Sequence, residues 1–203
     1  MKYLCIDIGN VLCEVNMDLF IKSLYEACNI SEDDAKSFLR RFQKMHDLGY
    51  TTLEEELKEK LGIKSKYTVN KLILDWNETL ITYESNINLL NKLSKEYDLK
   101  IALLSNVGIE HASIMADKLR FDGFFDSTIK WFSCEVGARK PSTIYYQSFL
   151  TAYPEFTGAL YIDDLQENLD VGSKLGLNSF KFDLTKSVFE DKIKEIELFI
   201  TNG

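Results

Sequence analysis

The chain has 203 residues, of which 45% are hydrophobic and 28% are charged, a composition typical of a soluble globular protein with one medium domain or a domain plus a modest insertion. Its formal charge of -8 and its pI near 4.9 argue against binding nucleic acid through a broad basic face, because neutralising phosphates requires an excess of Lys and Arg. The four cysteines are scattered without a Cys-x-x-Cys pair, so we expect neither a zinc site nor a disulfide framework.

The chain opens with an apolar run, Tyr3–Ile6, that predicts a β-strand ending at Asp7 and followed by a turn at Gly9 and Asn10. Because this strand begins at about Lys2, we expect no signal peptide and therefore a cytoplasmic protein. No apolar run approaches the roughly 20 residues needed to span a bilayer, so we expect no membrane partner.

Helical periodicity then continues from about residue 16 to residue 81 without an intervening strand. The four predicted helices cover Leu19–Cys28, Ser31–Met45, Thr51–Gly62 and Val69–Leu80. Four consecutive helices predict a separate helical bundle inserted into the chain. His46 falls at the end of the second helix, which would overhang a site beneath it, so we keep this residue as a weak candidate for a substrate contact.

From residue 82 onward, helices and strands alternate, which predicts an α/β fold: a doubly wound, mostly parallel, Rossmann-like sheet built from residues 1–15 and 82–203. The predicted strands cover Lys100–Ser105, Phe125–Trp131, Ala159–Ile162 and Ser179–Phe182. The predicted helices cover Asn86–Glu96, Ile109–Leu119, Thr143–Ala152, Leu165–Leu175 and Lys186–Ile200.

Residues suited to phosphoryl transfer stand at the ends of these strands. Asp7 ends the first strand, Ser105 ends the second, and Asp163-Asp164 follows the strand at Ala159–Ile162, while Lys140 precedes a proline in a connecting segment. Ligands of such sheets bind beyond the carboxyl ends of the strands, so we expect these side chains to form one site. A carboxylate can accept a phosphoryl group and then lose it to water, which makes Asp7 the candidate nucleophile.

The order and context of these residues resemble the motifs of the haloacid dehalogenase-like (HAD) superfamily, whose hydrolases use an aspartate nucleophile. The first motif, Asp7-Ile8-Gly9-Asn10-Val11, is similar to that of an Asp-x-Gly-Asn-Val subgroup that includes bacterial sugar-1-phosphate phosphatases. The resemblance implies that residues 16–81 form a helical cap over the core. It also implies that a monomer or homodimer acts on a small phosphorylated metabolite.

The resemblance implies a Mg²⁺ site as well. Its ligands would be Asp7, the carbonyl oxygen of Gly9, and Asp164, with Asp163 as an additional or outer ligand. Asn168 lies one helical turn beyond Asp164 and would face the same site. Mg²⁺ is bound in this way by one or two carboxylates, a carbonyl oxygen and waters.

The remaining implied roles concern the phosphate. Ser105 would donate a hydrogen bond to a phosphoryl oxygen, together with the backbone amide of Asn106 at the start of the following helix. The turn Gly9-Asn10 would complete the phosphate site. Lys140 would supply a positive charge to the phosphate and to the nucleophile; Arg139 is its rival, but the family pattern places the lysine directly before the proline.

Gly9 departs from the family pattern, because most phosphatases of the superfamily have a second aspartate there as the general acid. Glu14 should lie past the turn, towards the cap, and so does not replace it. Two alternatives to a phosphatase stay open. One is a metal-independent dehalogenase that uses Asp7 on a carbon–halogen bond. The other is a catalytically weak domain that binds phosphate or a partner protein, for which Gly9 is the only direct support.

Overall fold

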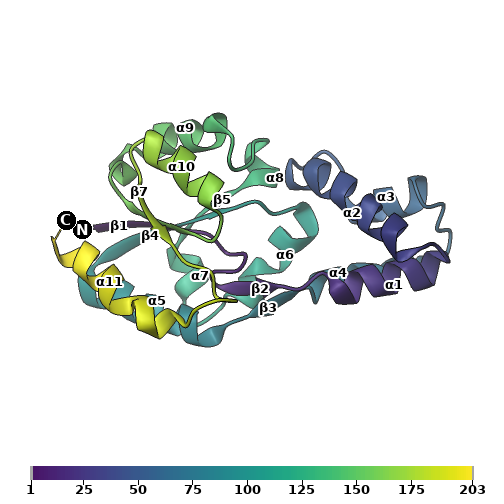
Figure 1. The fold of residues 1–203 in the computed structure, drawn as a ribbon, viewed down its shortest axis with the longest axis horizontal. Coiled ribbons are helices and arrows are strands. Elements are labelled where there is room, and N and C mark those ends of the chain that lie inside the picture. The colour runs from purple at the N-terminus through teal and green to yellow at the C-terminus, as the bar shows by residue number, and fades with distance from the viewer. Residues whose placement is uncertain (1, 203) are drawn as a thin grey trace.

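The computed structural model describes residues 2–202 and shows two lobes connected by a short ribbon of strands (Figure 1). The larger lobe contains a parallel sheet in the order β5-β4-β1-β6-β7. These strands are β1 (Lys2–Ile6), β4 (Leu99–Ser105), β5 (Ile129–Phe132), β6 (Leu160–Asp163) and β7 (Asn178–Lys181). The chain therefore winds outward from β1 in one direction and then in the other, as in a doubly wound sheet, and the strand order reverses between β1 and β6.

Helices cover both faces of this sheet (Figure 1). One face carries α5 (Glu84–Tyr97) and α11 (Phe189–Asn202), and the other carries α9 (Thr143–Ala152) and α10 (Gln166–Lys174). Side chains along a strand alternate between the faces, so Leu4 and Ile6 pack with α5 and α11 while Cys5 between them packs with α9 and α10. The predicted α/β fold is confirmed.

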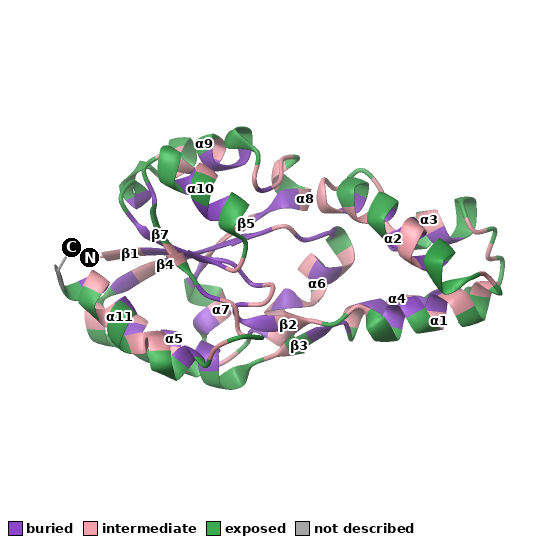
Figure 2. Ribbon diagram, viewed as in Figure 1, coloured by how far each residue is buried: buried purple, intermediate pink, exposed green. Residues whose placement is uncertain are grey.

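The smaller lobe consists of four helices with an apolar core of their own. They are α1 (Asp18–Cys28), α2 (Glu32–Asp47), α3 (Leu53–Glu59) and α4 (Lys66–Asn77). Their buried faces meet around Phe20, Phe42 and Trp76, whose rings pack edge to face. Figure 2 shows the buried residues of α1 and α4 facing the lobe interior, with exposed residues on the outer surfaces.

Two short strands connect the lobes. β2 (Cys13–Val15) pairs antiparallel with β3 (Leu80–Thr82), so the chain enters and leaves the helical lobe through one ribbon. The prediction of unbroken helix up to residue 81 is wrong here, because strands of three residues are too short to show a periodicity. The ribbon holds the helical lobe over the carboxyl ends of the sheet strands, with α4 packed against α6 (Ile109–Lys118) of the larger lobe.

A second difference concerns the strand predicted at Phe125–Trp131. Its first part is the short helix α7 (Phe124–Ser127), and β5 begins only at Ile129. The hydroxyls of Ser127 and Thr128 donate hydrogen bonds to the carbonyl oxygens of the short helix, which closes a helical turn before the strand begins. The remaining short elements are α8 (Ser133–Val136) and a 3₁₀ turn at Pro154–Phe156. Within residues 2–202, the helices are either too short or too polar to cross a bilayer.

Candidate active site

The loop after β1 presents Asp7 to a cleft between the lobes. Asp7 is 7% exposed, and its Oδ1 accepts a hydrogen bond from the Ile8 amide at 2.7 Å. The same oxygen lies 3.0 Å from Nζ of Lys140, whereas Oδ2 accepts no hydrogen bond from the described residues. One oxygen is therefore held in place and the other is left without a protein partner.

Lys140 is bound between two carboxylates. Its side chain is 1% exposed, and its Nζ lies 2.7 Å from Oδ2 of Asp163 and 3.0 Å from Oδ1 of Asp7. The hydroxyl of Tyr161 donates to the same Asp163 oxygen at 2.5 Å. Tyr161 and Asp163 stand two residues apart on β6, so the alternation of the strand turns both to the same face. The sequence pattern did not identify Tyr161 as part of the site.

Asp163 has no lone pair left for a further ligand. Its Oδ2 accepts from Lys140 and Tyr161, and its Oδ1 accepts from the Leu165 amide and from Nδ2 of Asn168, both at 2.9 Å. Four donors satisfy the two oxygens of a carboxylate. The structure therefore argues against the predicted role of Asp163 as an additional metal ligand. It indicates instead that Asp163 orients Lys140.

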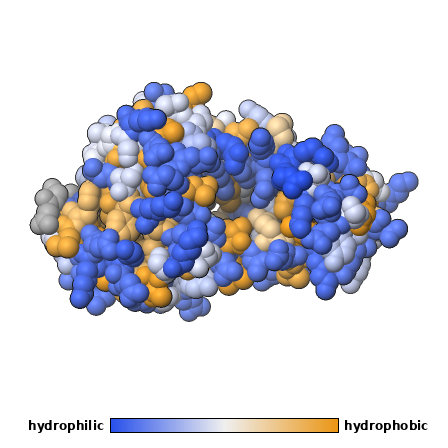
Figure 3. Space-filling model, viewed as in Figure 1, coloured by the Kyte–Doolittle hydropathy of each residue, from blue (hydrophilic) through white to orange (hydrophobic). Residues whose placement is uncertain are grey.

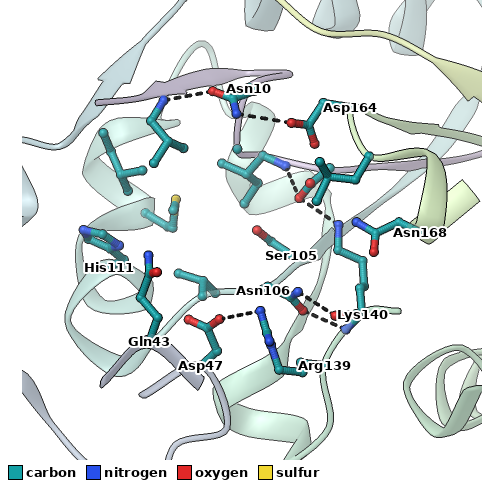
Figure 4. A pocket seen from close by; sticks show the side chains of 18 of the residues that line it. Asn10, Gln43, Asp47, Ser105, Asn106, His111, Arg139, Lys140, Asp164 and Asn168 are labelled. Atoms are coloured by element: carbon teal, nitrogen blue, oxygen red, sulfur yellow. Dashed lines mark hydrogen bonds and ion pairs between the residues drawn. The ribbon is translucent and has the colours of Figure 1, made fainter. Parts of the chain in front are cut away.

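Asp164 is held on the other side of Asp7. Its Oδ2 accepts from Nδ2 of Asn10 at 3.2 Å, and the Oδ1 of Asn10 accepts from the Val15 amide (Figure 4). Asn10 has a φ of 52°, a left-handed conformation that Asn tolerates better than most residues. The asparagine predicted as a phosphate contact thus connects the first loop to Asp164.

Asp7, Asp163 and Asp164 form an acid cluster, and oxygens of the three lie within 4.8 Å of one another, a spacing that fits a divalent cation. Three carboxylates face one ammonium group, so the cluster carries excess negative charge that such an ion would neutralise. Asp7 Oδ2 and Asp164 Oδ1 are the oxygens without a hydrogen-bond donor among the described residues. Oδ1 of Asn168 is a buried acceptor without a protein partner at the edge of the same cluster.

Burial and the neighbouring charges shift the pKa values of Asp7 and Lys140. Burial raises the pKa of Asp7 to about 7; Lys140 acts against this shift, and Asp163 and Asp164 add to it. Burial also lowers the pKa of Lys140, but the charges of Asp163 and Asp7 outweigh it, so this pKa lies above its ordinary value. Lys140 is therefore charged at neutral pH. A cation beside Asp7 would favour the ionised carboxylate in the same way.

Ser105 ends β4 at the bottom of the cleft, and Asn106 follows it. Ser105 is buried and lines the cleft, and its hydroxyl has no hydrogen-bond partner among the described residues. The side chain of Asn106 donates to the Lys140 carbonyl at 2.9 Å and accepts from the Lys140 amide at 2.8 Å. The helix start predicted at Ile109 is confirmed, so Asn106 lies before the N-terminus of α6 and not at it. The Asn106 side chain instead fixes the backbone of Lys140.

The cleft between the lobes encloses about 250 Å³ (Figure 3). Its floor is formed by Asp7, Asp164, Gly9 and Lys140, and its opposite side comes from the helical lobe. Gln43 and Asp47 of α2 line this side one helical turn apart, and Asp47 forms an ion pair of 3.1 Å with Arg139 (Figure 4). Gln43 and Asp47 were not assigned to the site from sequence, because no motif marks them, and Arg139 was considered there only as the rival of Lys140.

His46 does not line the cleft, so the structure argues against its predicted substrate contact. It is fully buried, packs against Phe42 and Trp76, and hydrogen-bonds the carboxylate of Glu110 on α6. A Cβ on Gly108 would lie 1.8 Å from its ring, so the two lobes meet here without space for a side chain. Its role in this structure is to join the lobes.

No protein-family model matches the chain, and no curated protein matches its sequence. Solved structures do match. A HAD family enzyme from Bacteroides thetaiotaomicron, in a wild-type complex with magnesium and inorganic phosphate, has a TM-score of 0.77 at 20% identity, covering 92% of this chain and 96% of that one. A predicted HAD-like family hydrolase from Porphyromonas gingivalis has a TM-score of 0.78 at 19% identity, covering 97% and 98%.

The L-2-haloacid dehalogenase from Xanthobacter autotrophicus is also similar, with a TM-score of 0.61 at 16% identity, covering 97% of this chain and 82% of that one. At these identities the likeness concerns the fold. The resemblance inferred from the motifs is confirmed at this level, and the Asp-x-Gly-Asn-Val subgroup stays a prediction.

Proposed function

The chain has the fold of the HAD-like hydrolases, and on this fold we propose a Mg²⁺-dependent phosphatase that acts on a small phosphorylated metabolite such as a sugar phosphate. The observation that carries the proposal is the pairing of Asp7: one oxygen is fixed by Ile8 and Lys140, and the other is free beside the cleft. A nucleophile requires this combination of fixed orientation and an unused lone pair.

In the proposed reaction, Oδ2 of Asp7 attacks phosphorus in line with the leaving oxygen, whose bond to phosphorus breaks. The phosphoryl group is then bound to Asp7 as an acyl phosphate. Water attacks the same phosphorus, phosphate departs, and the carboxylate is restored. Lys140 and the Ser105 hydroxyl donate to the phosphoryl oxygens, and Asp163 keeps Lys140 in position through their 2.7 Å contact.

Asp7 and Asp164 would hold the metal with the Gly9 carbonyl, which accepts no backbone hydrogen bond among the described residues. Bound Mg²⁺ supplies positive charge to the transferring phosphoryl group. The magnesium and phosphate complex of the similar Bacteroides thetaiotaomicron enzyme supports this assignment. The cleft volume of about 250 Å³ lies below the usual range for drug-sized ligands and suits a small metabolite.

The rival is a dehalogenase, since the Xanthobacter autotrophicus enzyme shares the fold. In that reaction the same Asp7 oxygen would attack a carbon atom and release halide. No cation would then be needed, and the negative charge of Asp164 beside the nucleophile would hinder an attacking carboxylate that must stay ionised. The acid cluster therefore favours the phosphatase.

Asp7→Asn tests the proposal. We expect the variant to retain its fold and thermal midpoint and to lose all but a trace of phosphate release from p-nitrophenyl phosphate, because an amide cannot form the acyl phosphate. Activity above a few per cent of wild type would rule out the covalent route. Chelation with EDTA should stop the wild-type reaction and Mg²⁺ should restore it. Halide release from 2-chloropropionate in EDTA would favour the dehalogenase instead.

A further inference from the structure

His111 lines the cleft on the side away from the acid cluster. It extends from α6 and lines the cleft, with 6% of its surface exposed. Figure 4 shows His111 and Gln43 on one side of the cleft, and Asp164 and Lys140 on the opposite side. With the phosphate bound at the acid cluster, the His111 end faces the leaving group.

The hydrogen bonds of His111 determine which nitrogen carries the proton. Nε2 lies 2.9 Å from the carbonyl oxygen of Trp76 and 3.3 Å from the hydroxyl of Thr79. A carbonyl oxygen only accepts, and the Thr79 hydroxyl itself donates to the same carbonyl at 2.6 Å. Nε2 therefore carries the hydrogen. Burial lowers the pKa of His111 to about 4, so the ring is neutral at pH 7 and Nδ1 is a bare acceptor.

Nδ1 of His111 has no hydrogen-bond partner among the described residues. Unlike Nδ1 of His46, which is fully buried without a partner, this nitrogen is not fully buried. An unpaired nitrogen that is not sealed in the interior, on a residue that lines the cleft, opens into the cleft. The ring itself is fixed, because it stacks on Trp76 with centroids 4.5 Å apart and planes at 4°.

We propose that His111 determines specificity by accepting, at Nδ1, a hydrogen bond from a hydroxyl group of the leaving alcohol. This inference rests on the proposed phosphatase function and narrows its substrates to esters of hydroxylated alcohols. A bare imidazole nitrogen only accepts hydrogen bonds, so a carboxylate or phosphate of the leaving group is disfavoured at Nδ1 itself. A leaving group with an ammonium would need a free carboxylate, but Asp47 at this end is already paired with Arg139. A hydroxyl group is an uncharged donor that satisfies Nδ1.

The test compares two kinds of substrate in three proteins. The substrates are p-nitrophenyl phosphate, which has no hydroxyl, and the best substrate among glucose 1-phosphate, glucose 6-phosphate and ribose 5-phosphate. The variants are His111→Phe, which keeps a ring on Trp76, and Thr79→Val as the control, because Thr79 is buried in the same contact but does not line the cleft. The measured quantity is the ratio of kcat/KM for the sugar phosphate to that for the aryl phosphate.

We expect His111→Phe to lower this ratio roughly 3- to 10-fold, the usual effect of losing one neutral hydrogen bond, and Thr79→Val to leave it within about twofold. The inference is overturned if the ratio in His111→Phe equals that of wild type, or if wild type hydrolyses the aryl ester but none of the sugar phosphates. If wild type hydrolysed none of these esters, the proposed function itself would be contradicted.

A second measurement does not depend on turnover. The protein has only two histidines, so its imidazole ¹⁵N resonances can be assigned with a His46→Gln variant. In the inert Asp7→Asn variant, free His111 should show the neutral tautomer with its proton on Nε2. Saturation with the best sugar phosphate should shift the Nδ1 resonance, whereas inorganic phosphate alone should not. An Nδ1 resonance that is unmoved by the sugar phosphate would overturn the inference.

Discussion

Gly9 lines the cleft at the position where most phosphatases of the resembled superfamily have a general acid. None of the described acidic or histidine side chains near the cleft is placed to donate this proton instead. Glu14 accepts a hydrogen bond from Tyr83 at 3.1 Å and does not line the cleft. Asp47 lines it but is paired with Arg139, and the proton of His111 is held by a carbonyl oxygen. The leaving oxygen must therefore depart with little proton transfer.

Gly9→Asp should restore the missing proton donor. A Cβ at Gly9 would meet only the Cγ2 of Val15, at 3.3 Å, so the loop can accept a side chain after a shift of a few tenths of an ångström. A general acid typically contributes about 10²- to 10⁴-fold in rate, or about 2.7–5.4 kcal/mol of activation free energy. We expect up to this gain for phosphates of primary alcohols and almost none for p-nitrophenyl phosphate.

The assay is kcat across phosphate esters graded by leaving-group pKa, from nitrophenols through phenol to primary alcohols. Wild type should show a steep dependence, with good turnover of aryl and anomeric sugar phosphates and poor turnover of simple alkyl phosphates. Gly9→Asp should flatten the dependence. Gly9→Asn is the matched control, because its side chain has the same size and no acidic proton. A flat wild-type profile, or an equal gain in Gly9→Asn, would refute the reasoning.

Three further predictions concern the metal, a buried tyrosine and a buried histidine. Asp164→Asn should raise the Mg²⁺ concentration for half-maximal activity at least tenfold, while Asp170→Asn, an exposed change on the next helix, should not; equal titrations would contradict the ligand assignment. Tyr161→Phe removes a donor to the buried Asp163 carboxylate and should lower the free energy of unfolding by about 1.5–3 kcal/mol in urea denaturation; an unchanged midpoint would show that this bond is not stabilising. The folded pKa of His111, about 4, lies below its ordinary value of 6.5, so the unfolded chain binds a proton more readily. As pH falls from 6.5 to 4, the free energy of unfolding of wild type should therefore decrease by up to about 3 kcal/mol more than that of His111→Gln. If the free energy of unfolding depended on pH in the same way in both proteins, the pKa shift would be contradicted.

Much of the core and the composition of the acid cluster could be predicted from sequence. Alternating strands and helices imply parallel strands, and the carboxyl ends of parallel strands lie at one edge of the sheet. Asp7, Ser105 and Asp163 each end an apolar run, so local pattern alone predicted that these side chains would meet. The structure places them at the ends of β1, β4 and β6, which are neighbours in the sheet.

The separate roles of the acids in this cluster could be assigned only from interatomic distances. A sequence shows that Asp163 and Asp164 are adjacent, but not that four donors saturate the first while the second keeps an unpaired oxygen. Tyr161 belongs to the site only because β6 turns it to the face of Lys140. Hydrogen bonds between residues far apart in the chain leave no local signal.

Tertiary structure alone determines which residues line the side of the cleft away from the acid cluster. Helical periodicity predicted α2, but not which of its polar residues face the cleft. Gln43 and Asp47 line the cleft, whereas Arg40 and Lys44 are exposed outside it. The orientation of α2 depends on the packing of Phe42 and His46 against Trp76 and on the β2–β3 ribbon, which are contacts between distant segments. The sequence by itself therefore determined the fold class and the chemical groups of the acid cluster, and the packing of the two lobes decided which side chains meet the substrate.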